Sequence, residues 1–263
     1  MNWKQLISAK RFGMEEFHEE RQENRSEFQR DYDRLIFSAP FRRLQNKTQV
    51  FPLPDSVFVH NRLTHSLEVA SVGRSLGDDV AKALLERHPE LQDSFLPEIG
   101  SIVSAACLAH DLGNPPFGHS GEKAISTFFS EGKGVRLKEK QPNGEQLSPM
   151  EWEDLTHFEG NANAFRILTH QFEGRRKGGF VLTYTTLASI VKYPFSSSLA
   201  GTKSKFGFFV SEEESFQKIA TELGLTLLNE HPLKYARHPL VYLVEAADDI
   251  CYQMMDIEDA YKL

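Results

Sequence analysis

Residues 106–119 read Ala-Cys-Leu-Ala-His-Asp-Leu-Gly-Asn-Pro-Pro-Phe-Gly-His, and they complete an apolar run that begins at Ile99. Such a run predicts a buried helix. Two polar side chains, His110 and Asp111, stand at its end, and burying them costs free energy unless a partner satisfies them. A divalent cation accepts a nitrogen and an oxygen ligand together. A hydrogen-bonded His–Asp pair at a helix end is the alternative, because one dipeptide is weak motif evidence.

The composition is that of an acidic globular chain. Its 263 residues are 40% hydrophobic and 25% charged, with a formal net charge of -7, so no global positive field attracts nucleic acid. The N-terminus lacks a signal-peptide pattern, and no apolar run approaches the length of a membrane span. Cys107 and Cys251 lie in apolar stretches, which is typical of buried free thiols in a reducing compartment. We therefore expect a soluble, cytoplasmic protein with no membrane partner. Without a repeat or a clear boundary, we also expect a single domain over residues 1–263.

A second histidine stands near the start of another predicted helix. Residues 63–70 carry apolar side chains at helical spacing, and Asn61 or Thr64 is suited to cap the helix. Alone, His65 would more often be a structural histidine than a ligand. Arg62 lies at the same helix N-terminus, where free amides and the helix dipole favour an anion.

The last apolar segment predicts a buried helix that starts at Pro239 and runs to Ala260. Asp248, Tyr252 and Asp256 are spaced by four residues, so they share one face of this helix. A buried carboxylate needs a cation or hydrogen-bond donors. Asp248 is therefore a further ligand candidate.

A helix is also expected directly after His119, with Glu122 in its first turn. Glu122 has two interpretations. It compensates the helix dipole, which is common, or it pairs with His119 and faces the same site as His110 and Asp111.

The remaining segments complete an all-α expectation with two irregular parts. Residues 131–156 are polar and rich in Gly, Lys, Glu and Pro, which predicts a long loop insertion. Residues 182–193 predict a helix that Pro194 ends. A short strand or hairpin arm is expected near Phe206–Val210.

The ordered set His65, His110-Asp111 and Asp248, each on a helix with an apolar face, resembles the HD-domain metal-dependent phosphohydrolases. Neighbouring stretches narrow the resemblance to the deoxyguanosine triphosphate triphosphohydrolases, and it runs nearly from end to end. Those stretches are 42–51 (Arg-Arg-Leu-Gln-Asn-Lys-Thr-Gln-Val-Phe), 60–66 (His-Asn-Arg-Leu-Thr-His-Ser), 110–119, 157–161 (His-Phe-Glu-Gly-Asn), 192–194 (Lys-Tyr-Pro) and 245–250 (Glu-Ala-Ala-Asp-Asp-Ile).

The resemblance implies an HD helical core that hydrolyses a deoxynucleoside triphosphate, dGTP above all, to the deoxynucleoside and inorganic triphosphate. It implies a divalent metal ion held by His65, His110, Asp111 and Asp248. Magnesium and manganese come first, while mixed His and carboxylate ligands also suit iron, cobalt, nickel or zinc. The catalytic residues implied are His119, Glu122 and His157.

The resemblance also implies the residues that contact the substrate. Arg62 and Lys192 match phosphate contacts, and Tyr193 is a weaker match. Tyr252 would pack on the sugar where a 2′-hydroxyl would clash. Gln49 and Asp256 would hydrogen-bond the 3′-hydroxyl, and Val50 would lie near the base or sugar.

Members of this family continue well beyond the position of Leu263, so we expect this sequence to lack a C-terminal helical extension. From the family we also expect a homo-oligomer, and an allosteric nucleotide or single-stranded DNA effector is a further expectation. Two alternatives stay open: another HD-superfamily nucleotide phosphohydrolase, and a nucleotide-binding regulator without turnover. The presence of both His119 and Glu122 argues against the regulator.

Overall fold

The structure is a computed structural model that describes residues 2–16, 25–48, 60–142, 144–174, 176–201 and 204–262. As the sequence predicts, the fold is all-α, with a small two-stranded sheet. The α-helices are α1 (Trp3–Leu6), α2 (Glu27–Ile36), α3 (Ala39–Arg42), α4 (Arg62–Arg87), α5 (Ile99–Ala109), α6 (Gly118–Ser130), α7 (Pro149–Thr156), α8 (Gly160–Thr169), α9 (Tyr184–Ile190), α10 (Glu213–Glu222) and α11 (Val241–Lys262). Short 3₁₀ turns join them: η1 (Arg43–Asn46), η2 (Pro89–Leu91), η3 (Leu96–Glu98), η4 (Lys133–Lys138), η5 (Ser197–Leu199) and η7 (Val210–Glu212).

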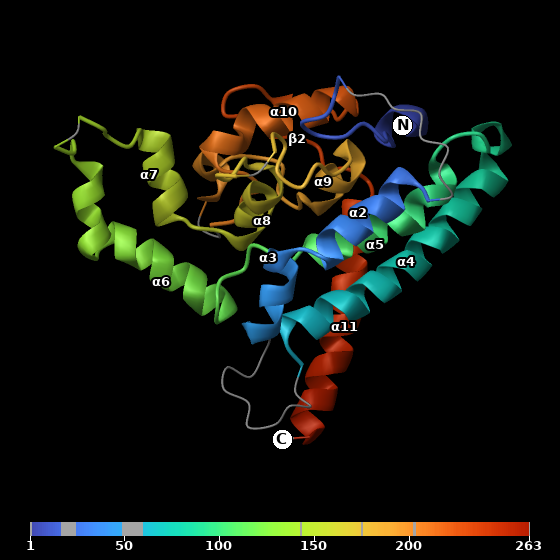
Figure 1. The fold of residues 1–263 in the computed structure, drawn as a ribbon, viewed down its shortest axis with the longest axis horizontal. Helices are drawn as coiled ribbons and strands as arrows, with labels where there is room; N and C mark the ends of the chain where they lie inside the picture. Colours follow the sequence, from blue (N-terminus) through green and yellow to red (C-terminus); the bar gives the residue numbers. More distant parts are fainter. Residues whose placement is uncertain are drawn as a thin grey trace.

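Helix α5 is the centre of the core, as its apolar sequence predicts. Its side chains are buried on every face, because α2, α4, α9 and α11 all pack against it. Figure 1 shows α4 and α5 side by side and α11 extending from the body to the C-terminus. The end of α5, where His110 and Asp111 follow, is thereby surrounded by other helices.

Helix α4 begins where its capping residues place it. The Asn61 side chain accepts hydrogen bonds from the backbone N–H groups of Leu63 and Thr64, so Asn61 is the cap. Farther along, α4 approaches α5 closely, since a Cβ atom on Gly77 would lie 2.7 Å from the Cα of Gly100. The cap and this close crossing together fix where the first turn of α4 meets the end of α5.

The prediction of a long loop over residues 131–156 was wrong. This segment contains η4 and α7, which pack against α6 and form the arm at the left of Figure 1. Helix α7 starts with a capping box, in which Ser148 and Glu151 each accept a hydrogen bond from the other's backbone N–H. Pro149 in the first turn fits the same start. The polar composition of this segment reflects a solvent-facing helix rather than a loop.

The strand expected near Phe206–Val210 was also misplaced. The sheet pairs β1 (Leu227–Asn229) with β2 (Lys234–Tyr235) in antiparallel fashion. Phe206, Gly207 and Phe208 are all buried, but they lie in a loop whose Gly207 N–H donates to the carbonyl of Phe195. A buried apolar stretch is a strand only where it pairs with a neighbouring strand.

A buried ion pair joins the N-terminal segment to α2 and α9. The Arg11 guanidinium donates to Asp31 Oδ1 at 2.7 Å, to the Val181 carbonyl and to Glu27. Thr183 donates its backbone N–H and its hydroxyl to Asp31 Oδ2 at 2.9 and 2.6 Å. Both carboxylate oxygens of the fully buried Asp31 are thus paired. We call this group (Arg11, Glu27, Asp31 and Thr183) the Arg11–Asp31 cluster.

Among the described residues, no helix combines the length and the apolar character that a membrane crossing requires.

Candidate active site

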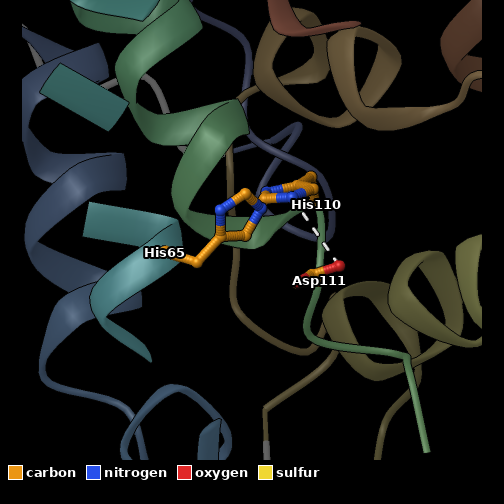
Figure 2. A group of neighbouring side chains, drawn as sticks. All are labelled: His65, His110 and Asp111. Atoms are coloured by element: carbon orange, nitrogen blue, oxygen red, sulfur yellow. Dashed lines mark ion pairs between the residues drawn. The ribbon is translucent and has the colours of Figure 1, made fainter. Parts of the chain in front are cut away.

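Three of the predicted ligands converge from α4 and the end of α5. His65 lies on α4, and His110 and Asp111 follow α5; their nearest ligand atoms all lie within 4.8 Å of one another (Figure 2). His110 Nδ1 is 2.6 Å from the Cys107 carbonyl oxygen. A carbonyl only accepts, so Nδ1 carries a proton, and Nε2 is the nitrogen that a metal ion could bind once its own proton is lost. His110 Nε2 is buried and has no hydrogen-bond partner among the described residues, which is the arrangement of a metal ligand.

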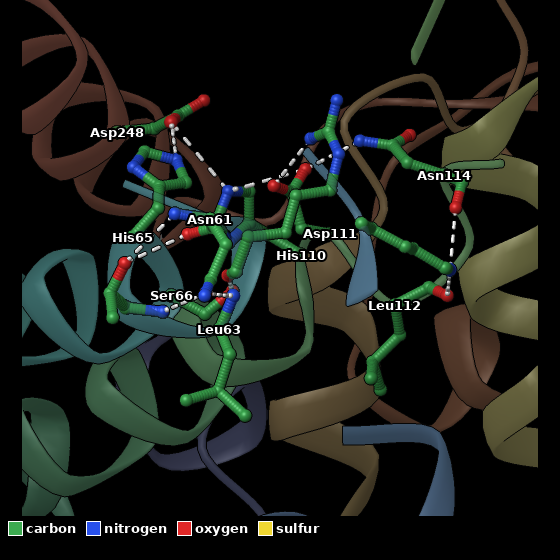
Figure 3. A network of polar contacts seen from close by, with 12 residues as sticks. Asn61, Leu63, His65, Ser66, His110, Asp111, Leu112, Asn114 and Asp248 are labelled. Carbon is green, nitrogen blue, oxygen red and sulfur yellow. Dashed lines mark hydrogen bonds and ion pairs between the residues drawn. The ribbon is translucent and has the colours of Figure 1, made fainter. Parts of the chain in front are cut away.

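The fourth predicted ligand arrives from α11. Asp248 Oδ1 lies 3.0 Å from His65 Nε2 and 3.6 Å from His110 Nε2 (Figure 3). Burial alone would lower the pKa of His110, but Asp111 and Asp248 outweigh it and raise that pKa to about 9. Burial would raise the pKa of Asp248, yet the two imidazoles hold it far below its ordinary value. We call these four residues the His–Asp cluster. Two nitrogen and two oxygen ligands fit a divalent ion.

Outer contacts fix the orientation of Asp111. Arg62 Nη1 donates to Asp111 Oδ2 at 2.6 Å, and Asn114 Nδ2 donates to Asp111 Oδ1 at 2.5 Å. Burial disfavours the charged carboxylate, but His110 and Arg62 outweigh it and lower the pKa of Asp111. Asp111 is therefore held ionised, as a metal ligand must be.

A cavity of about 470 Å³ opens beside the His–Asp cluster. It brings together residues that the sequence predicted from segments far apart along the chain. The predicted residues in its wall are Arg62, His65, His110, Asp111, His119, Glu122, Lys192, Tyr193, Asp248 and Tyr252.

Four predicted residues are not among those that line the cavity. Gln49 and Val50 lie outside the described residues. Asp256 lies one turn beyond Tyr252 on α11, and its Oδ1 is buried without a hydrogen-bond partner in the described structure. His157 ends α7, and its Nδ1 lies 3.1 Å from the Glu153 carboxylate. The geometry therefore gives the expected catalytic role of His157 no support from the cavity.

His119 and Glu122 form a pair at the rim of the cavity. His119 Nδ1 lies 2.7 Å from Glu122 Oε2, and the Gly160 N–H donates to Glu122 Oε1 at 2.8 Å. The His119 side chain is 85% exposed, whereas that of Glu122 is 11% exposed. Glu122 therefore lies at the N-terminus of α8 rather than merely compensating its own helix α6, and it orients an otherwise open imidazole.

Lys192, two residues beyond the end of α9, is one of the cations in the cavity wall. Lys192 Nζ lies 3.0 Å from Glu245 Oε1, and Arg237 pairs with the other oxygen of Glu245 at 2.9 Å. Burial would lower the pKa of Lys192, but Glu245 outweighs it and raises that pKa. Lys192 is thus a held cation beside Tyr193, over whose ring it lies.

Sequence reasoning missed several residues in the cavity wall, among them Asn114, Glu159 and Lys205. Asn114 and Glu159 stand inside the stretches 110–119 and 157–161 that carried the resemblance, so their position in those stretches was an available signal. Lys205 stands in no such stretch. Its Nζ lies 2.7 Å from Glu159 Oε1 and 3.7 Å from Glu122 Oε2. These contacts join segments far apart in the sequence, so no local sequence pattern predicts them.

Comparison with known proteins gives a family match to part of the chain. Residues 62–178 match the family described as HD domain. This span includes His65, His110 and Asp111, whereas Asp248 lies beyond it.

Curated relatives match along the whole chain. A protein of Synechocystis sp. named deoxyguanosinetriphosphate triphosphohydrolase-like protein is 45% identical over 100% of this chain and 60% of its own length. One of the same name from Pseudomonas aeruginosa (strain LESB58) is 46% identical over 100% of this chain and 58% of its own length. A deoxyguanosinetriphosphate triphosphohydrolase of Yersinia enterocolitica is 37% identical over 99% of this chain and 55% of its own length. The chain thus spans at most 60% of each of these relatives.

Proposed function

We propose that this chain, whose residues 62–178 match the HD domain family, is a metal-dependent deoxynucleoside triphosphate triphosphohydrolase with dGTP as its preferred substrate. The products would be the deoxynucleoside and inorganic triphosphate. The names of the relatives support the substrate class. The observation that carries the proposal is the cavity itself, which joins the His–Asp cluster, a His–Glu pair and several cations in one wall.

The His–Asp cluster would hold the metal ion. His65, His110, Asp111 and Asp248 supply two imidazoles and two ionised carboxylates. Nε2 of His110 makes no hydrogen bond in the described structure and lies 3.6 Å from Asp111 Oδ1 and from Asp248 Oδ1. Magnesium or manganese is the first choice, and iron, cobalt, nickel or zinc also suits this set. When bound, such an ion polarises the α-phosphate and favours deprotonation of a water molecule.

The phosphates would meet the cationic side of the cavity. Arg62 holds Asp111 through Nη1, while its Nε is buried without a hydrogen-bond partner in the described structure. Lys192 lies on another part of the wall, with Tyr193 next to it. A guanidinium binds phosphate oxygens through directed hydrogen bonds, whereas an ammonium acts as a point charge. Arg62 would therefore orient the phosphate nearest the His–Asp cluster, and Lys192 would neutralise negative charge on the other phosphates of the substrate.

His119 and Glu122 would move the proton. Since Nδ1 of His119 faces Glu122 at 2.7 Å, the other ring nitrogen is free to take a proton from the attacking water or to give one to the leaving oxygen. Glu122 would keep the imidazole in that tautomer and orientation. We propose His157 as a further catalytic residue on resemblance alone.

The sugar would lie along α11. Tyr252 lines the cavity one turn after Asp248 and would exclude a 2′-hydroxyl by contact with the ring. Asp256 follows one turn later and does not line the cavity, so its hydrogen bond to the 3′-hydroxyl is proposed on resemblance alone. Gln49 would share the 3′-hydroxyl and Val50 would lie near the base or sugar, on resemblance alone.

Three further expectations stay predictions. They are a homo-oligomer, an effector that is a nucleotide or single-stranded DNA, and a cytoplasmic location.

Product analysis tests the proposal. The purified chain is incubated with each of the four dNTPs and Mg²⁺ or Mn²⁺, and inorganic triphosphate is resolved from pyrophosphate and phosphate. Triphosphate with deoxynucleoside supports the proposal, and the fastest base identifies the preferred substrate. Phosphate or pyrophosphate would assign the protein to another HD phosphohydrolase reaction. Nucleotide binding without any product would favour the regulator.

A further inference from the structure

Two buried carboxylates in the cavity wall share one cation. Side-chain exposure is 11% for Glu122 and 1% for Glu159. The Lys205 ammonium lies 2.7 Å from Glu159 Oε1 and 3.7 Å from Glu122 Oε2. Burial would lower the pKa of Lys205, but Glu159 and Glu122 outweigh it and raise that pKa. A charged Lys205 thus allows two like charges to lie side by side.

Glu159 is itself firmly fixed. As the N-cap of α8, its Oε2 accepts hydrogen bonds from the backbone N–H groups of Asn161 and Ala162. Its Oε1 accepts from Lys205 and from the Asn161 side chain. Lys205 lies in a loop rather than on a helix, so its ammonium position depends on Glu159.

Glu122, in contrast, has few restraints of its own. Oε1 is held by the Gly160 N–H, and Oε2 faces both His119 and Lys205. His119 is largely exposed and contacts Glu122. Whatever fixes Oε2 therefore also fixes the imidazole.

We propose that Lys205, anchored by Glu159, is a positioning residue that holds Glu122 and through it His119. The inference rests on the proposed function, in which His119 transfers a proton. Lys205 acts on the rate of that transfer rather than on substrate affinity, because its nearest contacts are carboxylates of the protein.

The kinetic test uses Lys205→Met, with Lys205→Arg as the conservative variant. Lys205→Met is expected to lower kcat by about tenfold or more while KM changes by less than about twofold. Lys205→Arg restores most of kcat. Glu159→Gln keeps a cap acceptor but loses the charge, and it lowers kcat in the same direction. Thermal melting shows whether Lys205→Met folds. If it does not, Glu159→Gln tests the proposal in its place.

A double variant separates action through Glu122 from an independent role. If Lys205 acts through Glu122, Lys205→Met adds no loss to Glu122→Gln. An independent, multiplicative loss would overturn the proposal. A rise in KM with unchanged kcat would also overturn it, and would make Lys205 a phosphate contact.

A readout without turnover keeps the inference distinct from the proposed function. The ring signals of His119 are recorded by NMR in the substrate-free protein. Lys205→Met is expected to move them as Glu122→Gln does, whereas the matched cavity variant Lys192→Met leaves them in place. If the wild type hydrolyses no dNTP, the proposed function fails, and these signals still decide the positioning role. Unmoved His119 signals in Lys205→Met would overturn it.

Discussion

The Arg11–Asp31 cluster and the His–Asp cluster both bury carboxylates among the core helices, but they are completed in different ways. Each oxygen of Asp31 faces a donor of the protein, and Arg11 spreads its N–H groups over Asp31, Glu27 and a carbonyl. In the other cluster, His110 Nε2 has no hydrogen-bond partner in the described structure and lies 3.6 Å from carboxylate oxygens of both Asp111 and Asp248. A closed cluster stabilises a fold, while an open one offers atoms to a ligand. Their responses to mutation should differ accordingly.

The largest effect is expected from the open cluster. His110→Ala or Asp111→Ala should abolish metal binding and turnover together, by more than about 100-fold, since even outer contacts of a metal ligand are worth that much. Bound metal is measured by mass spectrometry and turnover by product release. Asp31→Asn serves as the matched control in the closed cluster and should retain metal. Full metal content with lost turnover in either alanine variant would contradict the assignment of the ligands.

The closed cluster should respond in stability. Asp31→Ala removes the buried carboxylate partner of Arg11 and leaves the two Thr183 donors without their acceptor. It should lower the free energy of unfolding by about 3–5 kcal/mol, as measured by denaturant titration. Turnover of the folded protein at low temperature should persist. A loss of only a few tenths of a kcal/mol would show that this cluster does not carry the fold.

A third variant lies beside the open cluster without belonging to it. Glu122→Ala should slow turnover by about 100-fold, the lower end for general acid–base catalysis, and leave the metal in place. Metal content and kcat are compared in the same preparation. Equal loss of metal and turnover would place Glu122 among the supports of the metal rather than beside His119.

The open cluster should also respond to pH. Because the pKa of His110 is raised in the metal-free protein from its ordinary value of 6.5 to about 9, the protonated ring stabilises the fold below about pH 6.5. That stabilisation is lost as the pH rises through 9. A metal must displace this proton, so its affinity should rise by about tenfold per pH unit across this window. Calorimetric titrations at pH 6.5 to 9 in buffers of different ionisation enthalpy measure the affinity and the proton released. An affinity independent of pH would contradict this.

The smallest effect is expected at the cationic wall. Lys192→Ala should raise KM by about tenfold with little change in kcat, because it removes a charge-assisted contact to phosphate made equally in ground and transition states. Steady-state kinetics measures both constants. A fall in kcat at constant KM would instead place Lys192 in the chemical step.

The helices that carry the His–Asp cluster could be predicted from sequence because each signal is local. The apolar run before His110, the cap at Asn61 and the spacing of four after Asp248 all survive in the structure. Helix α7 was not predicted, although Ser148 and Glu151 have the spacing of a capping box. The polar, Gly- and Pro-containing composition of the segment favoured a loop instead.

The remaining site could not be predicted because it depends on contacts between distant segments. Lys205 meets Glu122 and Glu159 only after the loop before η7 has packed onto α8. His157 is the opposite case. It lies in the stretch 157–161 that carried the resemblance, but its side chain contacts Glu153 and does not line the cavity. Local spacing places a residue on a helix face, whereas tertiary packing decides what that face meets.

Helix α11 also sets a rule for how this sequence can change in length. Asp248 touches both imidazoles, Tyr252 lines the cavity and Met255 Sδ lies 3.2 Å from His65 Nδ1. One inserted residue after Asp248 would turn everything beyond it by about 100°, so the metal end and the sugar end would face different directions. In the arm of α6, η4 and α7, the residues that line the cavity all lie in the first turns of α6, and α7 is held separately, through the Val210 N–H that donates to Asp154. A change of length between η4 and α7 would therefore leave the cavity wall in register, while the register of α11 between its two ends must be inherited intact.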